Sequence, residues 1–132
     1  MWMTYSEPQY LEVTDEWREK FERFREEHAN DPEGNVANVI LYEDDNLRIW
    51  EMKLEPGECS DLHTHRHAYY LVVMSGDLVA GVTPKGHPVE PFIGIIPENG
   101  NTVPVPKGNT EWAWNVGKET YHEILVEVKD RS

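Results

Sequence analysis

The stretch Gly57-Glu58-Cys59-Ser60-Asp61-Leu62-His63-Thr64-His65-Arg66-His67-Ala68-Tyr69 holds three histidines at alternate positions. Side chains at positions i and i+2 of a β-strand point to the same face, so His63 and His65 can converge on one point. A strand that stays regular would add His67 and Tyr69 to that face. Neutral imidazole is the commonest metal ligand among side chains. The stretch therefore predicts a metal site held inside a small β-barrel.

The rest of the chain is dominated by short apolar segments that are separated by turns rich in glycine and proline. We expect strands at residues 36–42, 47–54, 68–74, 78–82, 92–96, 110–116 and 121–128. Many short strands with turns of this kind are typical of a sandwich or a closed barrel. The sequence therefore predicts an all-β fold.

One segment near the N-terminus has the pattern of a helix. Thr14 can cap it, and Trp17, Phe21 and Phe24 recur at the spacing of one apolar stripe. The stripe predicts packing against the barrel or against a second subunit, with a lid over a pocket as the alternative. We divide the chain into an N-terminal extension with the helix, residues 1–34, and a barrel, residues 35–132.

Composition narrows the class of protein. The chain has 132 residues, which suits one domain, and a formal charge of −13 from 25 acidic and 12 basic residues. A field of that sign disfavours nucleic acid and anionic membranes as partners. Cys59 is the only cysteine, and neither a signal peptide nor an apolar run long enough to cross a bilayer is visible. We therefore expect a cytoplasmic protein.

Two spacings point to a known family. The first is Gly57, five residues, His63, one, His65, three, Tyr69, six, Gly76; the second is Gly100, five, Pro106, one, Gly108, two, Glu111, three, Asn115. They resemble the two conserved motifs of the cupin superfamily over roughly residues 36 to 128. The resemblance implies a cupin-type jelly-roll β-barrel with one N-terminal α-helix, and it implies a homodimer.

The resemblance also implies a metal site, with departures. This chain has Tyr69 where most metallocupins have a glutamate ligand, and Glu111 where they have the last histidine. The implied metal ligands are His63, His65 and Glu111. Two histidines and one carboxylate form the set that non-haem Fe(II) oxygenases use, so we expect a divalent metal ion with Fe(II) favoured and Ni, Mn or Zn as alternatives.

Tyr69 is the candidate catalytic residue, as a hydrogen-bond donor, a general acid or a weak ligand, and His67 is an alternative fourth ligand. Of the other histidines, we expect His28 and His87 at the surface, whereas the strand period leaves His122 equally able to face the cavity or solvent.

We expect a metal-dependent cupin enzyme that acts on a small organic substrate with a carbonyl or carboxylate group, and we favour a non-haem Fe(II) dioxygenase. A metal-dependent lyase or isomerase fits the same residues, because fold alone does not select a reaction. The alternative of another class is a non-catalytic cupin that binds a small ligand or serves a structural role.

Overall fold

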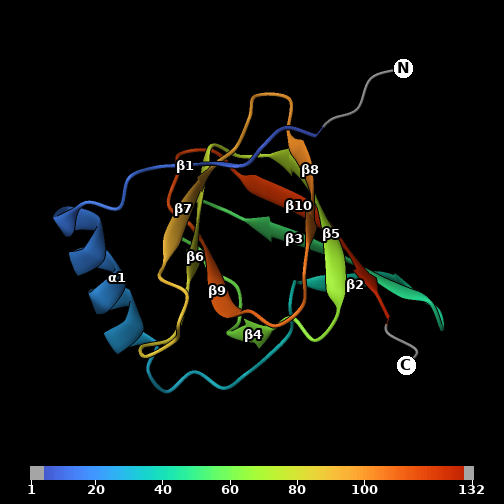
Figure 1. Ribbon diagram of the computed structural model, residues 1–132, viewed down its shortest axis with the longest axis horizontal. Coiled ribbons are helices and arrows are strands. Elements are labelled where there is room, and N and C mark those ends of the chain that lie inside the picture. Colours follow the sequence, from blue (N-terminus) through green and yellow to red (C-terminus); the bar gives the residue numbers. More distant parts are fainter. Residues whose placement is uncertain (1–4, 130–132) are drawn as a thin grey trace.

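The computed structural model describes residues 5–129 as two five-stranded antiparallel sheets that face each other, with one helix alongside (Figure 1). In chain order the elements are β1 (Gln9–Tyr10), α1 (Asp15–Glu27), β2 (Val39–Glu43), β3 (Leu47–Leu54), β4 (His63–Thr64), β5 (Ala68–Ser75), β6 (Leu78–Val82), β7 (Phe92–Ile95), β8 (Asn101–Val105), β9 (Thr110–Asn115) and β10 (Tyr121–Val128). One sheet has the order β1-β7-β6-β9-β4 and the other β2-β3-β10-β5-β8. The predicted jelly-roll barrel with one N-terminal helix is confirmed.

Strict alternation of side chains builds the interior of the second sheet. Along β10, the four odd-numbered residues from Tyr121 to Glu127 are buried, and the even-numbered ones are half-buried or exposed. Trp50, Met52 and Leu54 do the same on the neighbouring β3. Because successive side chains of a strand point to opposite faces, one sheet face forms the cavity wall and the other faces outward.

Helix α1 covers the outer face of the first sheet, as Figure 1 shows. The Thr14 side chain accepts a hydrogen bond from the Trp17 backbone N–H at 3.4 Å, which caps the first turn. Phe24 is buried, and its ring lies 5.5 Å from that of Trp112 and 4.6 Å from that of Trp114. The predicted packing of the helix against the barrel is confirmed, and Trp112 and Trp114 point away from the cavity toward the helix.

Strands β1 and β8 were not predicted, because the sequence gives them little signal. β1 has two residues, too few for a period to show. The strand expected at His63 and His65 is the two-residue β4. β8 contains Pro104 and lies at a sheet edge, where a proline does not interrupt the hydrogen-bonded ladder. The first barrel strand begins at Val39 rather than at Val36, which is buried in the core ahead of it.

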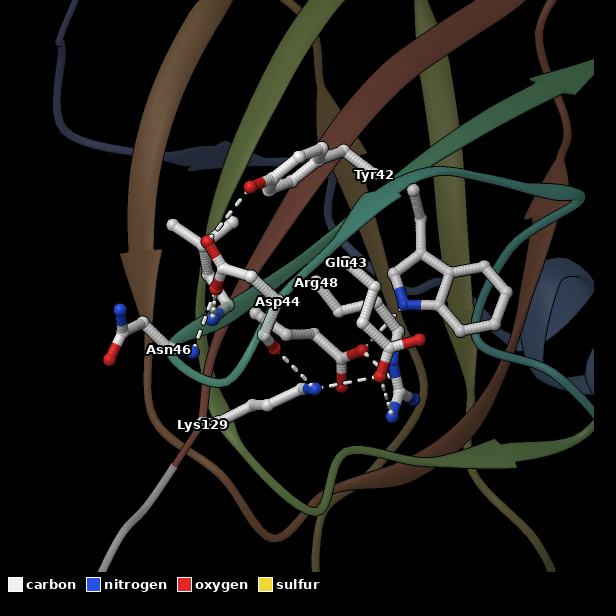
Figure 2. Close-up of polar contacts among 9 residues, drawn as sticks. Tyr42, Glu43, Asp44, Asn46, Arg48 and Lys129 are labelled. Atoms are coloured by element: carbon white, nitrogen blue, oxygen red, sulfur yellow. Dashed lines mark hydrogen bonds and ion pairs between the residues drawn. The ribbon is translucent and has the colours of Figure 1, made fainter.

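Edge strand β2 is fixed to the end of β10 by the polar network of Figure 2. The side chain of Asp44 accepts backbone N–H bonds from Asn46 at 2.7 Å and Leu47 at 3.0 Å, which closes the β2–β3 turn. Lys129 Nζ donates to Glu43 at 2.7 Å and to the Asp44 carbonyl at 2.6 Å. The turn and the C-terminal strand therefore hold each other in place.

The N-terminal segment joins the two sheets at their other edge. The Ser6 N–H donates to Asn101 Oδ1 at 2.8 Å, and Asn101 Nδ2 donates back to the Ser6 carbonyl at 2.9 Å. Ser6 precedes β1 and Asn101 begins β8, the outer strands of the two sheets. Among the described residues, no helix is long and apolar enough to cross a membrane. The division of the chain at residue 34 stays a prediction.

Candidate metal centre

His63, His65 and Glu111 converge inside the barrel. Their ligand atoms, one from each residue, all lie within 4.8 Å of one another. Both histidines are buried. His63 on β4 lies directly opposite Glu111 on β9 in the antiparallel register, so sheet pairing itself brings the carboxylate to the histidines. The structure thus groups all three residues that the sequence singled out as ligands.

The ring of His63 is held in one orientation. Its Nδ1 lies 2.8 Å from the carbonyl oxygen of Asp61, so Nδ1 carries the proton and donates it. This leaves Nε2 without a proton and able to bind a metal, an arrangement common to histidine ligands. Burial, and next the neighbouring His65, lower the pKa of His63. The neutral form that a ligand requires is therefore favoured.

His65 is positioned by a turn and by an aromatic neighbour. Its backbone N–H donates to the Asn109 carbonyl at 2.9 Å, and its carbonyl accepts from the Gly108 N–H at 2.8 Å. Its ring stacks on that of Tyr69 with centroids 4.1 Å apart, and Nε2 lies 3.7 Å from Glu111 Oε1. The imidazole therefore has a fixed place between the phenol and the carboxylate.

Glu111 is oriented by its own neighbours. Asn109 Nδ2 donates to Glu111 Oε2 at 3.1 Å, which leaves Oε1 as the oxygen nearest His65. Gly81, on the adjacent strand β6, provides the space: a Cβ atom there would lie 2.6 Å from Glu111 Oε2 and would also collide with the ring of Phe92. An amide that holds a ligand and a glycine that makes room for it are what a built site requires.

The residues present fit a divalent metal ion. Bonds of about 2.0–2.2 Å to nitrogen and oxygen place two ligand atoms of one ion up to roughly 4.4 Å apart. The three donors lie within 4.8 Å of one another, slightly wider than that limit, so the side chains would draw together around an ion. One carboxylate and two imidazoles suit Fe, Mn, Ni or Zn in chemical type.

The cluster opens into a cavity of about 650 Å³. Most of its wall is apolar, from side chains such as Leu71, Val103, Val105 and Leu125. Tyr69 also lines it, and burial, with the charges of nearby carboxylates, raises the pKa of its phenol well above the usual value. The hydroxyl therefore stays protonated and can donate a hydrogen bond to a bound molecule.

The other histidines divide among different surroundings. His67 lies outside the group of three: the strand breaks after β4, and His67 lines a separate cavity with Arg48 and Glu127. His87 was expected at the surface, but it is half-buried and lines the main cavity. His122 faces outward and lies 2.9 Å from Glu51.

His28 ends helix α1 and is half-buried rather than a free surface cation. Its ring stacks on Phe24 at 4.1 Å and its Nδ1 lies 2.8 Å from Asp31 Oδ2. Asp31 also accepts from the indole N–H of Trp112 at 3.0 Å. These contacts anchor the end of the helix to the barrel.

Glu123 is a cavity residue that the sequence analysis did not single out. It is 3% exposed, lines the main cavity, and has its pKa raised by burial to about 8. The available signal was the alternation of residues 121–128. That pattern placed Glu123 on the same face as Tyr121 and Leu125, but the period does not tell which face is inner.

Facing antiparallel sheets around a buried histidine pair define a protein with the cupin jelly-roll fold, and comparisons with solved structures agree. A cupin domain from Bordetella pertussis Tohama I superposes with a TM-score of 0.61 at 17% identity, covering 74% of this chain and 100% of that chain. A conserved protein of unknown function from Streptococcus pyogenes superposes with a TM-score of 0.52 at 16% identity, covering 100% of this chain and 98% of that chain.

A plant protein is similar in sequence. Auxin-binding protein T85 of Nicotiana tabacum is 24% identical over 95 residues, which cover 69% of this chain and 50% of that protein. The chain thus matches about half the length of this relative. No family model matches the chain.

Proposed function

We propose that the protein is a metal-dependent enzyme that acts on a small organic molecule. The observation that carries this proposal is the convergence of His63, His65 and Glu111 within 4.8 Å at the wall of a cavity of about 650 Å³. A structural barrel has no need of two buried histidines and a half-buried glutamate around one point, because burying polar side chains is costly.

The metal would be held by these three residues, with Fe(II) favoured. Two histidines and a carboxylate leave coordination positions open. When bound, the ion would polarise a substrate carbonyl or carboxylate oxygen or, as iron, support dioxygen chemistry. Dioxygenase activity is our first choice on this ground, and a lyase or isomerase uses the same site.

The protein's own groups would orient the substrate and keep water away. Tyr69 donates its phenolic proton in a hydrogen bond to a substrate oxygen beside His65, since its raised pKa keeps the hydroxyl protonated. Apolar side chains such as Leu71 and Val105 surround the rest of the molecule. A substrate carboxylate needs the metal for binding, because the chain as a whole carries a charge of −13.

A second candidate is binding without catalysis. The name of the tobacco relative, an auxin-binding protein, favours it. In this version the same cavity holds a small ligand, and the three residues with or without a metal serve only to orient it. The two candidates differ in whether bound substrate is turned over.

Metal content tests the proposal. Protein purified without a histidine tag is measured by plasma mass spectrometry beside a His63→Ala/His65→Ala variant and a His122→Ala control, whose histidine faces outward. Near one equivalent of metal in the wild type and the control, and none in the double variant, supports the site. A wild type that stays metal-free and refuses added Fe(II), Ni, Mn and Zn overturns the metal-dependent enzyme.

Loaded protein is then tested for oxygen uptake with small carboxylic and carbonyl compounds. Turnover that is lost in the double variant supports the enzyme, and saturable binding without turnover selects the binding protein.

A further inference from the structure

Glu123 is a buried acid for which the described part of the chain offers no cationic partner. It lies on β10 between Met52 of β3 and Val73 of β5 in the sheet register, so its strand neighbours on both sides are apolar. Within residues 5–129 its side chain forms no ion pair, and Oε2 has no hydrogen-bond partner. Among the described residues, only the Tyr121 hydroxyl hydrogen-bonds to this carboxyl group. A buried carboxyl oxygen in an apolar wall is expected to have a hydrogen-bond partner, which a bound ligand could provide.

The surroundings of Glu123 favour its neutral form. The titratable groups that act on it or face it are Tyr121 on its own strand, Tyr69 on β5 and Glu111 on the opposite sheet, and none of them is a cation. Burial, together with the charge of Glu111, raises the pKa of Glu123 to about 8. Near neutral pH the group is then mostly a carboxylic acid that carries one O–H donor.

Glu123 lies at a different level of the strands from Tyr69, whose ring stacks on the candidate ligand His65. On the β5–β10 pair, Tyr69 is opposite Glu127, whereas Glu123 is opposite Val73. Four residues of strand separate these levels, about 13 Å. Leu71 and Leu125 face the cavity between them. Apolar side chains therefore line the cavity between the backbone level of Tyr69 and that of Glu123.

We propose that Glu123 forms a second binding subsite, where its neutral carboxyl group binds an uncharged oxygen acceptor of the substrate. The partner is a carbonyl, amide or hydroxyl oxygen at the end of the molecule opposite the group held by His63, His65 and Glu111. The assignment of that first end rests on the proposed function. The substrate class is thus a small molecule with a metal-binding head, an apolar body and a neutral oxygen at its tail.

Charge at the tail would be selected against. A second carboxylate on the substrate would face the carboxyl group of Glu123 without any cation that the described residues place beside it. An ammonium tail would require Glu123 to ionise inside an apolar wall, which burial opposes.

Three probes with one ring test the subsite: cyclohexanone, cyclohexylammonium and cyclohexanecarboxylate. Their binding to purified protein is followed by NMR titration at pH 7. The variants are Glu123→Gln, which keeps a neutral hydrogen-bonding group of the same shape, and Glu123→Leu, which removes it. Glu90→Leu is the control at an exposed position, and thermal melting checks that each variant folds.

We expect cyclohexanone to bind the wild type and Glu123→Gln with affinities within about threefold, and Glu123→Leu about tenfold more weakly, as the loss of one buried hydrogen bond implies. Both charged probes should bind the wild type more weakly than the ketone. Equal ketone affinity for Glu123→Leu and the wild type overturns the subsite. A preference for the ammonium probe that Glu123→Gln abolishes also overturns it, and so does the absence of binding by every probe.

Repeating the titrations on the His63→Ala/His65→Ala variant distinguishes binding at Glu123 from binding at the metal site. Unchanged ketone binding there supports a subsite that is independent of the metal, even if the protein holds no metal at all. Loss of ketone binding in that double variant places the ketone at the histidines and overturns the subsite while leaving the metal centre standing.

Discussion

Glu111 of β9 lies directly opposite His63 of β4 in an antiparallel strand pair. Residues so paired have Cβ atoms about 4.5–5.5 Å apart, a distance that two side chains can bridge through one ion. The acid therefore takes its place by sheet register, while Asn109 and Gly81 set its final orientation. The position of this candidate ligand therefore depends on groups outside the candidate metal site.

Asn109→Ala is expected to weaken metal binding about 10–100-fold, because Glu111 loses the hydrogen bond that fixes its Oε2. Metal affinity is measured by competition with a chelator. Asn99→Ala, which removes an amide from an exposed turn, serves as the control and should leave the affinity unchanged. Equal affinities for all three proteins would show that Asn109 has no positioning role.

Tyr69→Phe is expected to lower turnover about 100-fold with metal content unchanged, because it removes a proton donor but keeps the ring that stacks on His65. The control is Tyr70→Phe, whose exposed phenol points outward. Since the pKa of Tyr69 is raised, its loss should be felt equally at pH 6 and pH 9. A Tyr69→Phe protein that loses its metal would instead make the phenol a ligand.

Glu123 is expected to make the fold less stable as pH rises. Its pKa is about 8 in the folded protein against 4.5 ordinarily, so between these values the folded state holds a proton that the unfolded state has released. The stabilisation is complete below pH 4.5 and is lost as pH rises toward 8. The free energy of unfolding should fall by up to about 1.4 kcal/mol per pH unit in this window.

Urea denaturation at pH 5, 6.5 and 8, with chelator present, measures this effect as the difference between wild type and Glu123→Gln. The variant does not titrate at this position, so its free energy of unfolding relative to that of the wild type should increase as pH rises. A difference that is constant from pH 5 to pH 8 would mean that Glu123 is already ionised in the folded protein.

Phe24→Ala is expected to lower the free energy of unfolding by about 3–5 kcal/mol, as truncation of a buried phenylalanine generally does. Phe24 is 5% exposed and contacts the rings of Trp112 and Trp114. The exposed Glu19→Ala on the same helix should change stability by less than about 0.5 kcal/mol. Chemical denaturation provides both values, and a small loss for Phe24→Ala would show that the helix docks only weakly.

We propose that two copies of the chain associate through the edge strand β2. The side chains of Val39, Ile40, Leu41 and Tyr42 are each about half exposed, and an apolar edge strand is a surface for pairing with another chain. Leu41→Lys should convert a dimer to a monomer in light scattering after size-exclusion chromatography. Glu98→Lys, which adds positive charge in an exposed turn, should leave the dimer intact. A wild type that is already monomeric contradicts the proposal.

The sequence predicted the three candidate ligands but not the whole cavity. His63, His65 and Glu111 could be identified from their residue types and from their spacing relative to glycines and prolines in turns. Both features can be read from a single sequence without a structure. His67 fits the same alternation, yet the chain leaves the strand at residue 65, and a period cannot show where a strand breaks. Glu123 looked like any charged residue in a half-polar strand, because inner and outer faces differ only once a second sheet is present.

Because residue 81 is a glycine, even the smallest side chain introduced there would disturb the candidate metal site. One added methyl group could prevent metal binding while every candidate ligand is kept, because an alanine at position 81 would collide with Glu111 and Phe92. In related chains that keep all three candidate ligands, the residue at this position would then indicate whether those ligands can still bind a metal. The Gly81→Ala substitution is therefore a way to abolish metal binding that changes no candidate ligand and adds no charge.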